Sequence, residues 1–230
     1  MDKIFANAIH NISHHCFADD TQSYTDAPLP QVRMVADKLQ RCIVDVADWS
    51  GSRRLQLNRA KTDLMWFGSS TSLQSVSSLN RSIVVSEDII QPSNSVCYLG
   101  MQFENEMNIC TQIAKITQTC FFHIRRLCQV RRVLGCQLAA QLVSVLVISP
   151  LDHGNGTLAG LPQSTFASLQ WVLIDAAERL VCDLHPRDSV TSALIGLHWL
   201  PVPAHVEFKL CTIVYQSLHG SAPHYINDML

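Results

Sequence analysis

The sequence His15-Cys16-Phe17-Ala18-Asp19-Asp20-Thr21-Gln22-Ser23-Tyr24 places two adjacent carboxylates between strand-like flanks. A hairpin with a two-residue turn at Asp19 and Asp20 is expected here, because Asp tolerates the positive φ that such turns require. Adjacent carboxylates repel each other unless a cation lies near both of them. The stretch therefore predicts a hard-metal site, and the alternative is a solvated, inert acidic tip.

The composition predicts a globular protein. Hydrophobic residues make up 47% of the 230 residues, which is enough to build a core, and charged residues make up 16%. The formal net charge of −2 gives no sign of a nucleic-acid partner for the chain as a whole. The nine cysteines are an odd number without a Cys-x-x-Cys pair, which indicates neither a disulfide framework nor a zinc ribbon. We expect a reduced intracellular setting, in the nucleus or the cytoplasm.

Neither secretion nor a membrane partner is expected. The N-terminus lacks the basic region and apolar run of a signal peptide. The longest apolar stretch, residues 138–151, is interrupted by Gln141 and Ser144. It is shorter than the roughly 20 residues that cross a bilayer as a helix.

The first part of the chain is expected to be α+β. Apolar residues recur at intervals of three and four from Leu29 to Val46, which predicts an amphipathic helix packed on a sheet, with Gly51 as its left-handed stop. Residues 69–82 hold seven serines and one threonine, and they are typical of a surface loop or mobile linker. Short β-rich runs are expected at residues 61–67, 83–85, 88–90 and 95–103.

From residue 106 onwards the pattern predicts only helices. Apolar residues recur at intervals of three and four from Ile109 to Leu127, and a second run from Gln137 to Ile148 is expected to stop at Pro150. Further helices are expected at residues 164–181, 203–219 and 222–229. The chain is therefore expected to comprise two parts, residues 1–105 and residues 106–230.

A basic face is expected on the first of these helices. Between Met107 and Leu151 the sequence has no Asp or Glu but five basic residues. Arg131 falls on the apolar stripe, so the helix is expected to end or bend before it. Such a face suits phosphate contacts and stacking on bases or sugars; the alternative is an ordinary solvated face whose aromatic packs under a neighbour. The face consists of Lys115, Phe122, Arg125, Arg126 and Arg132.

The residues Phe17-Ala18-Asp19-Asp20, followed by Thr21-Gln22 and Tyr24, resemble the aromatic-Ala-Asp-Asp motif of reverse transcriptases, in the form found in non-LTR (LINE-type) retrotransposons. Further motifs follow in the order that this family uses, and they extend over nearly the whole chain. They are Leu55-Gln56-Leu57-Asn58, Lys61-Thr62, Leu64-Met65-Trp66-Phe67-Gly68, Tyr98-Leu99-Gly100, Leu151-Asp152-His153, Leu158-Ala159-Gly160-Leu161-Pro162, Leu197-His198-Trp199-Leu200-Pro201 and Phe208-Lys209-Leu210.

The resemblance implies a fold and a reaction. Residues 1–105 would be a partial palm, with an antiparallel hairpin, short strands and a packed helix, and residues 106–230 a helical thumb and connection region. The family reaction is RNA-directed DNA synthesis, a nucleotidyl transfer assisted by Mg²⁺. The implied partners are an RNA template, an RNA–DNA duplex and deoxynucleoside triphosphates.

The resemblance also implies roles for individual residues. Asp19 would be the principal Mg²⁺ ligand and Asp20 an auxiliary one. Lys61 would lie near the leaving pyrophosphate as a proton donor, or it is an exposed lysine at a strand start. The partner aspartate strand and the fingers would lie upstream of His14, so the chain is expected to be catalytically incomplete by itself. The alternatives are a noncatalytic nucleic-acid-binding or scaffolding remnant and a chain without a useful product.

Overall fold

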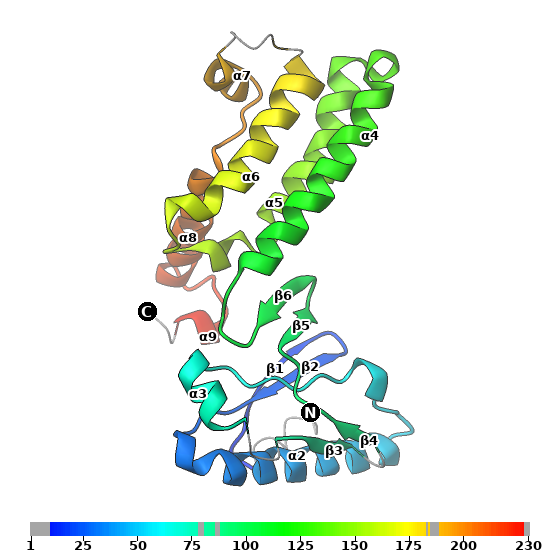
Figure 1. Ribbon diagram of the computed structural model, residues 1–230, viewed down its shortest axis with the longest axis vertical. Coiled ribbons are helices and arrows are strands. Elements are labelled where there is room, and N and C mark those ends of the chain that lie inside the picture. The colour runs from blue at the N-terminus through cyan, green and yellow to red at the C-terminus, as the bar shows by residue number, and fades with distance from the viewer. Residues whose placement is uncertain (1–9, 78–80, 86–87, 183, 185–188, 228–230) are drawn as a thin grey trace. The chain divides into compact units, whose positions relative to one another are not determined.

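The computed structural model describes residues 10–77, 81–85, 88–182, 184 and 189–227. The chain divides into two compact units, Met1–Asn108 and Ile109–Leu230. The first unit combines antiparallel strand pairs with helices, and the described part of the second unit is helical (Figure 1). The expected α+β class is therefore confirmed at this level.

The first strand pair carries the two adjacent carboxylates. β1 (Ser13–Phe17) and β2 (Asp20–Tyr24) are antiparallel, and Phe17 pairs with Asp20. The two-residue turn therefore consists of Ala18 and Asp19, and the positive φ of 53° belongs to Ala18. The turn expected at Asp19 and Asp20 is displaced by one residue, because strand register decides which residues occupy the turn.

A long amphipathic helix packs against the second strand pair. α2 (Val32–Ser52) follows a short 3₁₀ turn at Leu29–Gln31 and buries Val32, Val35, Ala36 and Cys42. It contacts β3 (Ile83–Val85), which pairs with β4 (Asp88–Ile90). The expected packing of this helix on strands is confirmed.

The side chain of Gln40 joins α2 to the edge of β3. The amide of Gln40 donates to the carbonyl oxygen of Val84 and accepts from the N–H of the same residue. Gln40 thus forms the two hydrogen bonds that a neighbouring strand would form. A strand edge that would otherwise present unpaired backbone groups is covered by the helix.

The end of α2 differs from the expectation. The helix continues through Gly51 to Ser52, and the residue with a positive φ of 59° is Arg54. The N–H of Leu55 donates to the carbonyl of Ser50 at 2.9 Å, and that of Arg54 donates to the carbonyl of Gly51 at 3.0 Å. This pair of bonds is a Schellman motif. The expected stop at Gly51 is wrong, because these hydrogen bonds hold Arg54 in the left-handed conformation.

Two further expectations for the first unit are wrong. Residues 61–67 do not form the expected strand. Lys61 is the last residue of a 3₁₀ turn (Arg59–Lys61), and Leu64 forms an isolated bridge with Pro92. The expected loop contains α3 (Ser70–Ser75), because the Ser69 hydroxyl caps its N-terminus by accepting from the N–H of Ser72 at 3.2 Å.

The β-rich run expected at residues 95–103 is a pair of strands. β5 (Ser95–Tyr98) and β6 (Met101–Glu104) are antiparallel and are joined by Leu99 and Gly100. Both turn residues have positive φ, 48° and 81°, as a type I′ hairpin turn requires.

The second unit begins with two antiparallel helical segments. α4 (Cys110–Val143) contains Gly135 at φ 70° and ψ 167°, and the chain reverses its direction there (Figure 1). Only glycine adopts this conformation readily. The second segment continues through a π-helical turn, Ser144–Ile148, into α5 (Ser149–Asp152). The Cys120 thiol donates to the carbonyl of Val147 at 3.7 Å, so the two segments pack on each other.

The remaining helices cover this pair. They are α6 (Gln163–Asp175), the π-helix η5 (Ala176–Cys182), α7 (Val190–Gly196), α8 (Val202–Leu218) and α9 (His224–Asn227). Among the described residues, Leu169, Val172 and Leu180 are fully buried in their shared core. Helices expected at residues 164–181 and 203–219 are confirmed, and residues 228–229 of the last expected helix lie outside the described residues.

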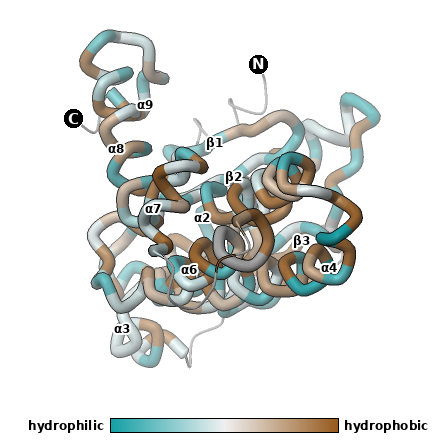
Figure 2. The backbone as a smooth tube through the Cα atoms, turned by 90° about the horizontal axis from the view of Figure 1, so that it is seen from above, coloured by the Kyte–Doolittle hydropathy of each residue, from teal (hydrophilic) through white to brown (hydrophobic). Residues whose placement is uncertain are grey.

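Pro150 does not stop the second segment. It lies in α5, directly after the π-helical turn Ser144–Ile148, and the left-handed residue after the helix is Gly154, at φ 67°. Figure 2 shows hydrophobic and hydrophilic residues alternating around α4. Taken as one stretch, Cys110–Asp152 is long and apolar enough to cross a membrane. The reversal at Gly135 divides this stretch into two packed segments.

Candidate nucleic-acid interface

The first segment of α4 separates an apolar face from a basic one. Ile113, Cys120, Ile124 and Leu127 are buried in the core of the second unit. On the opposite face, the side chains expected to contact nucleic acid are all exposed: Lys115, Phe122, Arg125, Arg126 and Arg132. This separation follows from the helical period of the sequence, which places residues about 100° apart.

An aromatic ring lies at the centre of the basic face. Phe122 is 54% exposed, and the guanidinium carbon of Arg126 lies 5.8 Å from the centre of its ring. The imidazole of His123 meets the same ring edge-on at 5.4 Å between centres. Phe122 is therefore not packed under a neighbour, and a cation next to an open aromatic face suits base stacking.

No acidic side chain among the described residues neutralises the cations of this face. Within the described part of the chain, none of Lys115, Arg125, Arg126 and Arg132 forms an ion pair. Arg125 uses its Nε to donate to the carbonyl of Phe121 at 3.2 Å, one turn earlier in the same helix. The positive charge of the face is thus available to an external anion.

Arg131 does not belong to this face. Its Nε donates to the carbonyl oxygen of Leu180 in η5 at 2.9 Å, and the side chain is partly buried. The helix runs past Arg131 and breaks at Gly135. The expectation that it ends before Arg131 is wrong, because a buried carbonyl provides the partner that an arginine on the apolar side needs.

The two adjacent carboxylates lie apart from this interface in the chain. Asp19 is in the β1–β2 turn and Asp20 is the first residue of β2, and both are exposed. Burial raises the pKa of the Tyr98 hydroxyl, and the nearby charges of Asp20 and Cys16 add to the increase. The β1–β2 hairpin therefore lies close to the end of β5.

The acidic hairpin does not present the ligand set of a two-metal site. Two-metal nucleotidyl transfer needs carboxylates that bridge ions about 3.5 to 4 Å apart. Asp19 and Asp20 are consecutive and open to solvent, and across residues 10–77, 81–85, 88–182, 184 and 189–227 no three His, Cys, Asp or Glu side chains are arranged to hold a metal ion. The residues described here do not fit the Mg²⁺ pair that the resemblance implies.

Lys61 is the last residue of the 3₁₀ turn Arg59–Lys61 and is exposed. Its N–H donates to the carbonyl of Asn58 at 3.1 Å, and the hydroxyl of Thr62 donates to the same oxygen at 3.0 Å. Asn58 therefore turns the chain before Lys61.

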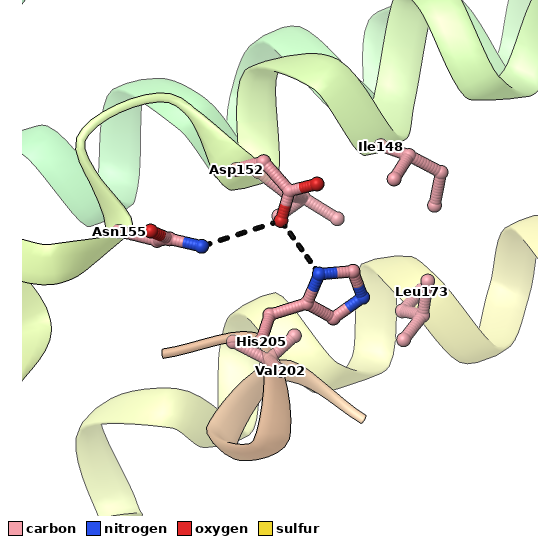
Figure 3. A pocket seen from close by; sticks show the side chains of 7 residues that line it. Ile148, Asp152, Asn155, Leu173, Val202 and His205 are labelled. Atoms are coloured by element: carbon pink, nitrogen blue, oxygen red, sulfur yellow. Dashed lines mark hydrogen bonds and ion pairs between the residues drawn. The ribbon is translucent and has the colours of Figure 1, made fainter. Parts of the chain in front are cut away.

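A polar cluster in the second unit was not expected from the sequence. His205 Nδ1 lies 2.8 Å from Asp152 Oδ1, which also accepts from the side-chain amide of Asn155 at 3.3 Å (Figure 3). The surrounding pocket is lined mainly by apolar side chains and has room for about one water molecule. The hydrogen bond to Asp152 raises the pKa of His205; burial opposes this shift, while the charge of Asp152 and the carbonyl of Leu200 increase it.

The pocket suits a structural contact better than a catalytic one. Besides the polar cluster it is lined by Ile148, Leu151, Leu173 and Val202, and none of its lining side chains is a Ser, Thr or Cys nucleophile. Asp152 and His205 lie on different helices, so no spacing rule in the sequence could have joined them.

Comparisons of the chain with protein-family models, curated proteins and solved structures give no match.

Proposed function

We propose that this chain binds nucleic acid through the basic face of α4. The observation that carries the proposal is a set of exposed cations that form no ion pair with any described residue, on the same helix face as an open aromatic ring. They are Lys115, Arg125, Arg126 and Arg132, and the ring is Phe122. A chain with a formal net charge of −2 does not attract nucleic acid through its overall charge, so the local concentration of cations is the relevant quantity.

Each part of the face would make a different contact. The guanidinium and ammonium groups would contact backbone phosphates and release counterions, which makes binding weaker as salt is added. Phe122 would stack on a base or a sugar without reading the sequence. Recognition by this face would therefore depend on the backbone and on base stacking more than on base identity.

The ligand class comes from the resemblance to non-LTR retrotransposon reverse transcriptases. In that family the helical thumb follows the duplex of primer and template, so an RNA–DNA duplex is the proposed ligand. The chain would then be a reverse-transcriptase fragment, consisting of a partial palm and a thumb, that retains nucleic-acid binding.

RNA-directed DNA synthesis is the second candidate function. The Phe17-Ala18-Asp19-Asp20 hairpin supports it, since the motif lies on an antiparallel strand pair as the resemblance implies. The reaction would require Mg²⁺, deoxynucleoside triphosphates and carboxylates in addition to Asp19 and Asp20. Nucleic-acid binding needs none of these and is the function that the described geometry supports better.

The test compares two triple variants of equal charge in a fluorescence anisotropy titration with an RNA–DNA duplex over a series of salt concentrations. Arg125→Ala, Arg126→Ala and Arg132→Ala together remove three cations of the face. Arg33→Ala, Arg41→Ala and Lys209→Ala together remove three exposed cations elsewhere. The first variant is expected to lose at least about tenfold in affinity and to reduce the salt slope by about 3.

The control variant is expected to bind with nearly unchanged affinity. Equal losses in both variants, or wild-type binding that does not weaken with salt, would contradict the proposal. A primer-extension assay with Mg²⁺ tests the second candidate, and incorporation that disappears in Asp19→Ala would establish it. The two assays separate binding from catalysis, because primer extension depends on the aspartates of the β1–β2 hairpin and fluorescence anisotropy measures duplex binding by α4.

A further inference from the structure

Two cysteines that are far apart in the sequence lie together at one end of the second unit. Cys136 directly follows the reversal at Gly135, and its thiol donates to the carbonyl oxygen of Val181 at 2.9 Å. Val181 precedes Cys182, the last residue of η5. The side chain of Cys136 thus touches the peptide bond that leads into Cys182.

Standard backbone geometry limits the distance between the Cys136 sulfur and the Cα of Cys182. The carbonyl oxygen of a residue lies about 3 Å from the next Cα in a trans peptide. The Cα of Cys182 is therefore within about 6 Å of the Cys136 sulfur, and the Cα of Cys136 lies up to about 3 Å beyond that sulfur. A disulfide needs the two Cα atoms about 4.4 to 6.8 Å apart. Closing a bond between the two sulfurs would require rotation of both side chains together with a backbone adjustment.

The electrostatics of Cys182 agree with this placement. Burial raises the pKa of Cys182, the nearby Cys136 raises it further, and Arg131 lowers it. Arg131 is held in place by its hydrogen bond to Leu180. Cys136 is exposed and Cys182 is half-buried, so Cys136 is the more accessible of the two to an oxidant.

We propose that Cys136 and Cys182 form a redox pair that closes to a disulfide when the protein meets a peroxide. The Cys136 sulfur attacks one oxygen of hydrogen peroxide, the O–O bond breaks, and one water leaves, so that Cys136 becomes a sulfenic acid. The Cys182 sulfur then attacks the Cys136 sulfur, the S–O bond breaks, and a second water leaves. The two thiols together lose two electrons and two protons, which reduce the peroxide to two waters.

The bond would fasten a specific part of the fold. It would join the start of the second segment of α4 to the end of η5, beside the turn at Gly135. A cross-link restricts the unfolded chain, so the oxidised protein would melt at a higher temperature than the reduced protein.

The experiment uses the full chain, reduced and then treated with hydrogen peroxide in small excess. Remaining thiols are alkylated, the protein is digested without reductant, and cross-linked peptides are identified by mass spectrometry. The expected result is a link between Cys136 and Cys182 that is at least about tenfold more abundant than any other cysteine pair and that dithiothreitol removes. Thermal melts before and after oxidation should show the increase in melting temperature.

Serine variants provide the controls. Cys136→Ser and Cys182→Ser should each abolish the link and the shift in melting temperature, whereas Cys211→Ser, at an exposed cysteine on α8, should retain both. Oxidation of wild-type Cys136 to a sulfinic acid without a link to Cys182 would overturn the proposal. The same would follow if the link formed equally often in urea-unfolded protein, because the folded geometry would then have no part in it.

Discussion

Asp152 and His205 join α5 to α8 through a contact of 2.8 Å between Oδ1 and Nδ1. The hydrogen bond to Asp152 raises the pKa of His205 above the value of 6.5 that it has when exposed. A group whose pKa is higher in the folded state binds its proton more tightly there, so protonation stabilises the fold.

The first prediction is that this contact makes stability depend on pH. Its stabilisation is fully present below about pH 6.5, and it is lost as the pH rises through the folded pKa of His205. Asp152→Asn should cost only on the order of 1 kcal/mol at about pH 6, because the carboxylate of Asp152 is 42% exposed and screened by solvent. The cost should be smaller at about pH 9, because His205 is then neutral. Urea unfolding of both proteins across this range measures the difference. A constant difference between wild type and Asp152→Asn would show that His205 does not titrate against Asp152.

The second prediction contrasts two glycines. Gly135→Ala should lower the free energy of unfolding by about 1 to 3 kcal/mol, because an alanine at φ 70° is strained although no atom obstructs its Cβ. Gly51→Ala should raise it by about 0.5 to 1 kcal/mol, because Gly51 lies in α2 with open space around it. Chemical denaturation of the two variants gives both values. Stabilisation by Gly135→Ala would mean that the two segments of α4 do not need the reversal.

The third prediction concerns the amide that covers the edge of β3. Gln40→Ala should destabilise the first unit by about 1 to 2 kcal/mol, because two backbone groups of Val84 lose their partner. Gln56→Ala, which shortens an exposed glutamine of the same unit in the same way, should have little effect. Hydrogen exchange at the Val84 amide is the direct measurement, and it should be faster only in Gln40→Ala. Equal protection of this amide in Gln40→Ala and wild type would contradict the contact.

The fourth prediction rests on the proposed nucleic-acid interface. Phe122→Ala should weaken binding of an RNA–DNA duplex by about 1 to 3 kcal/mol without changing the salt slope, because it removes a stacking ring and no charge. Phe122→Tyr keeps a ring and should bind nearly as wild type does. Anisotropy titrations at several salt concentrations distinguish loss of stacking from loss of phosphate contacts. Weaker binding by Phe122→Tyr and Phe122→Ala to the same extent would argue against stacking.

The sequence by itself determined the features that depend on local periodicity. The alternation of apolar and basic residues from Ile109 to Arg132 follows the helical period, so both faces of the first segment of α4 could be predicted from it. The same rule located α2, α6 and α8, and the β-rich composition located residues 95–103, which form the β5–β6 hairpin and not a single strand. The role of the basic face in binding nucleic acid stays a prediction.

Only the tertiary structure decided which distant residues meet. The turn at Ala18 and Asp19 follows from strand register, and the left-handed stop at Arg54 follows from the hydrogen bonds that close α2. The contacts of Arg131 with Leu180 and of Asp152 with His205 each join segments about 50 residues apart. Side-chain period is a property of a few consecutive residues, whereas these contacts depend on how whole helices pack, so no local pattern contains them.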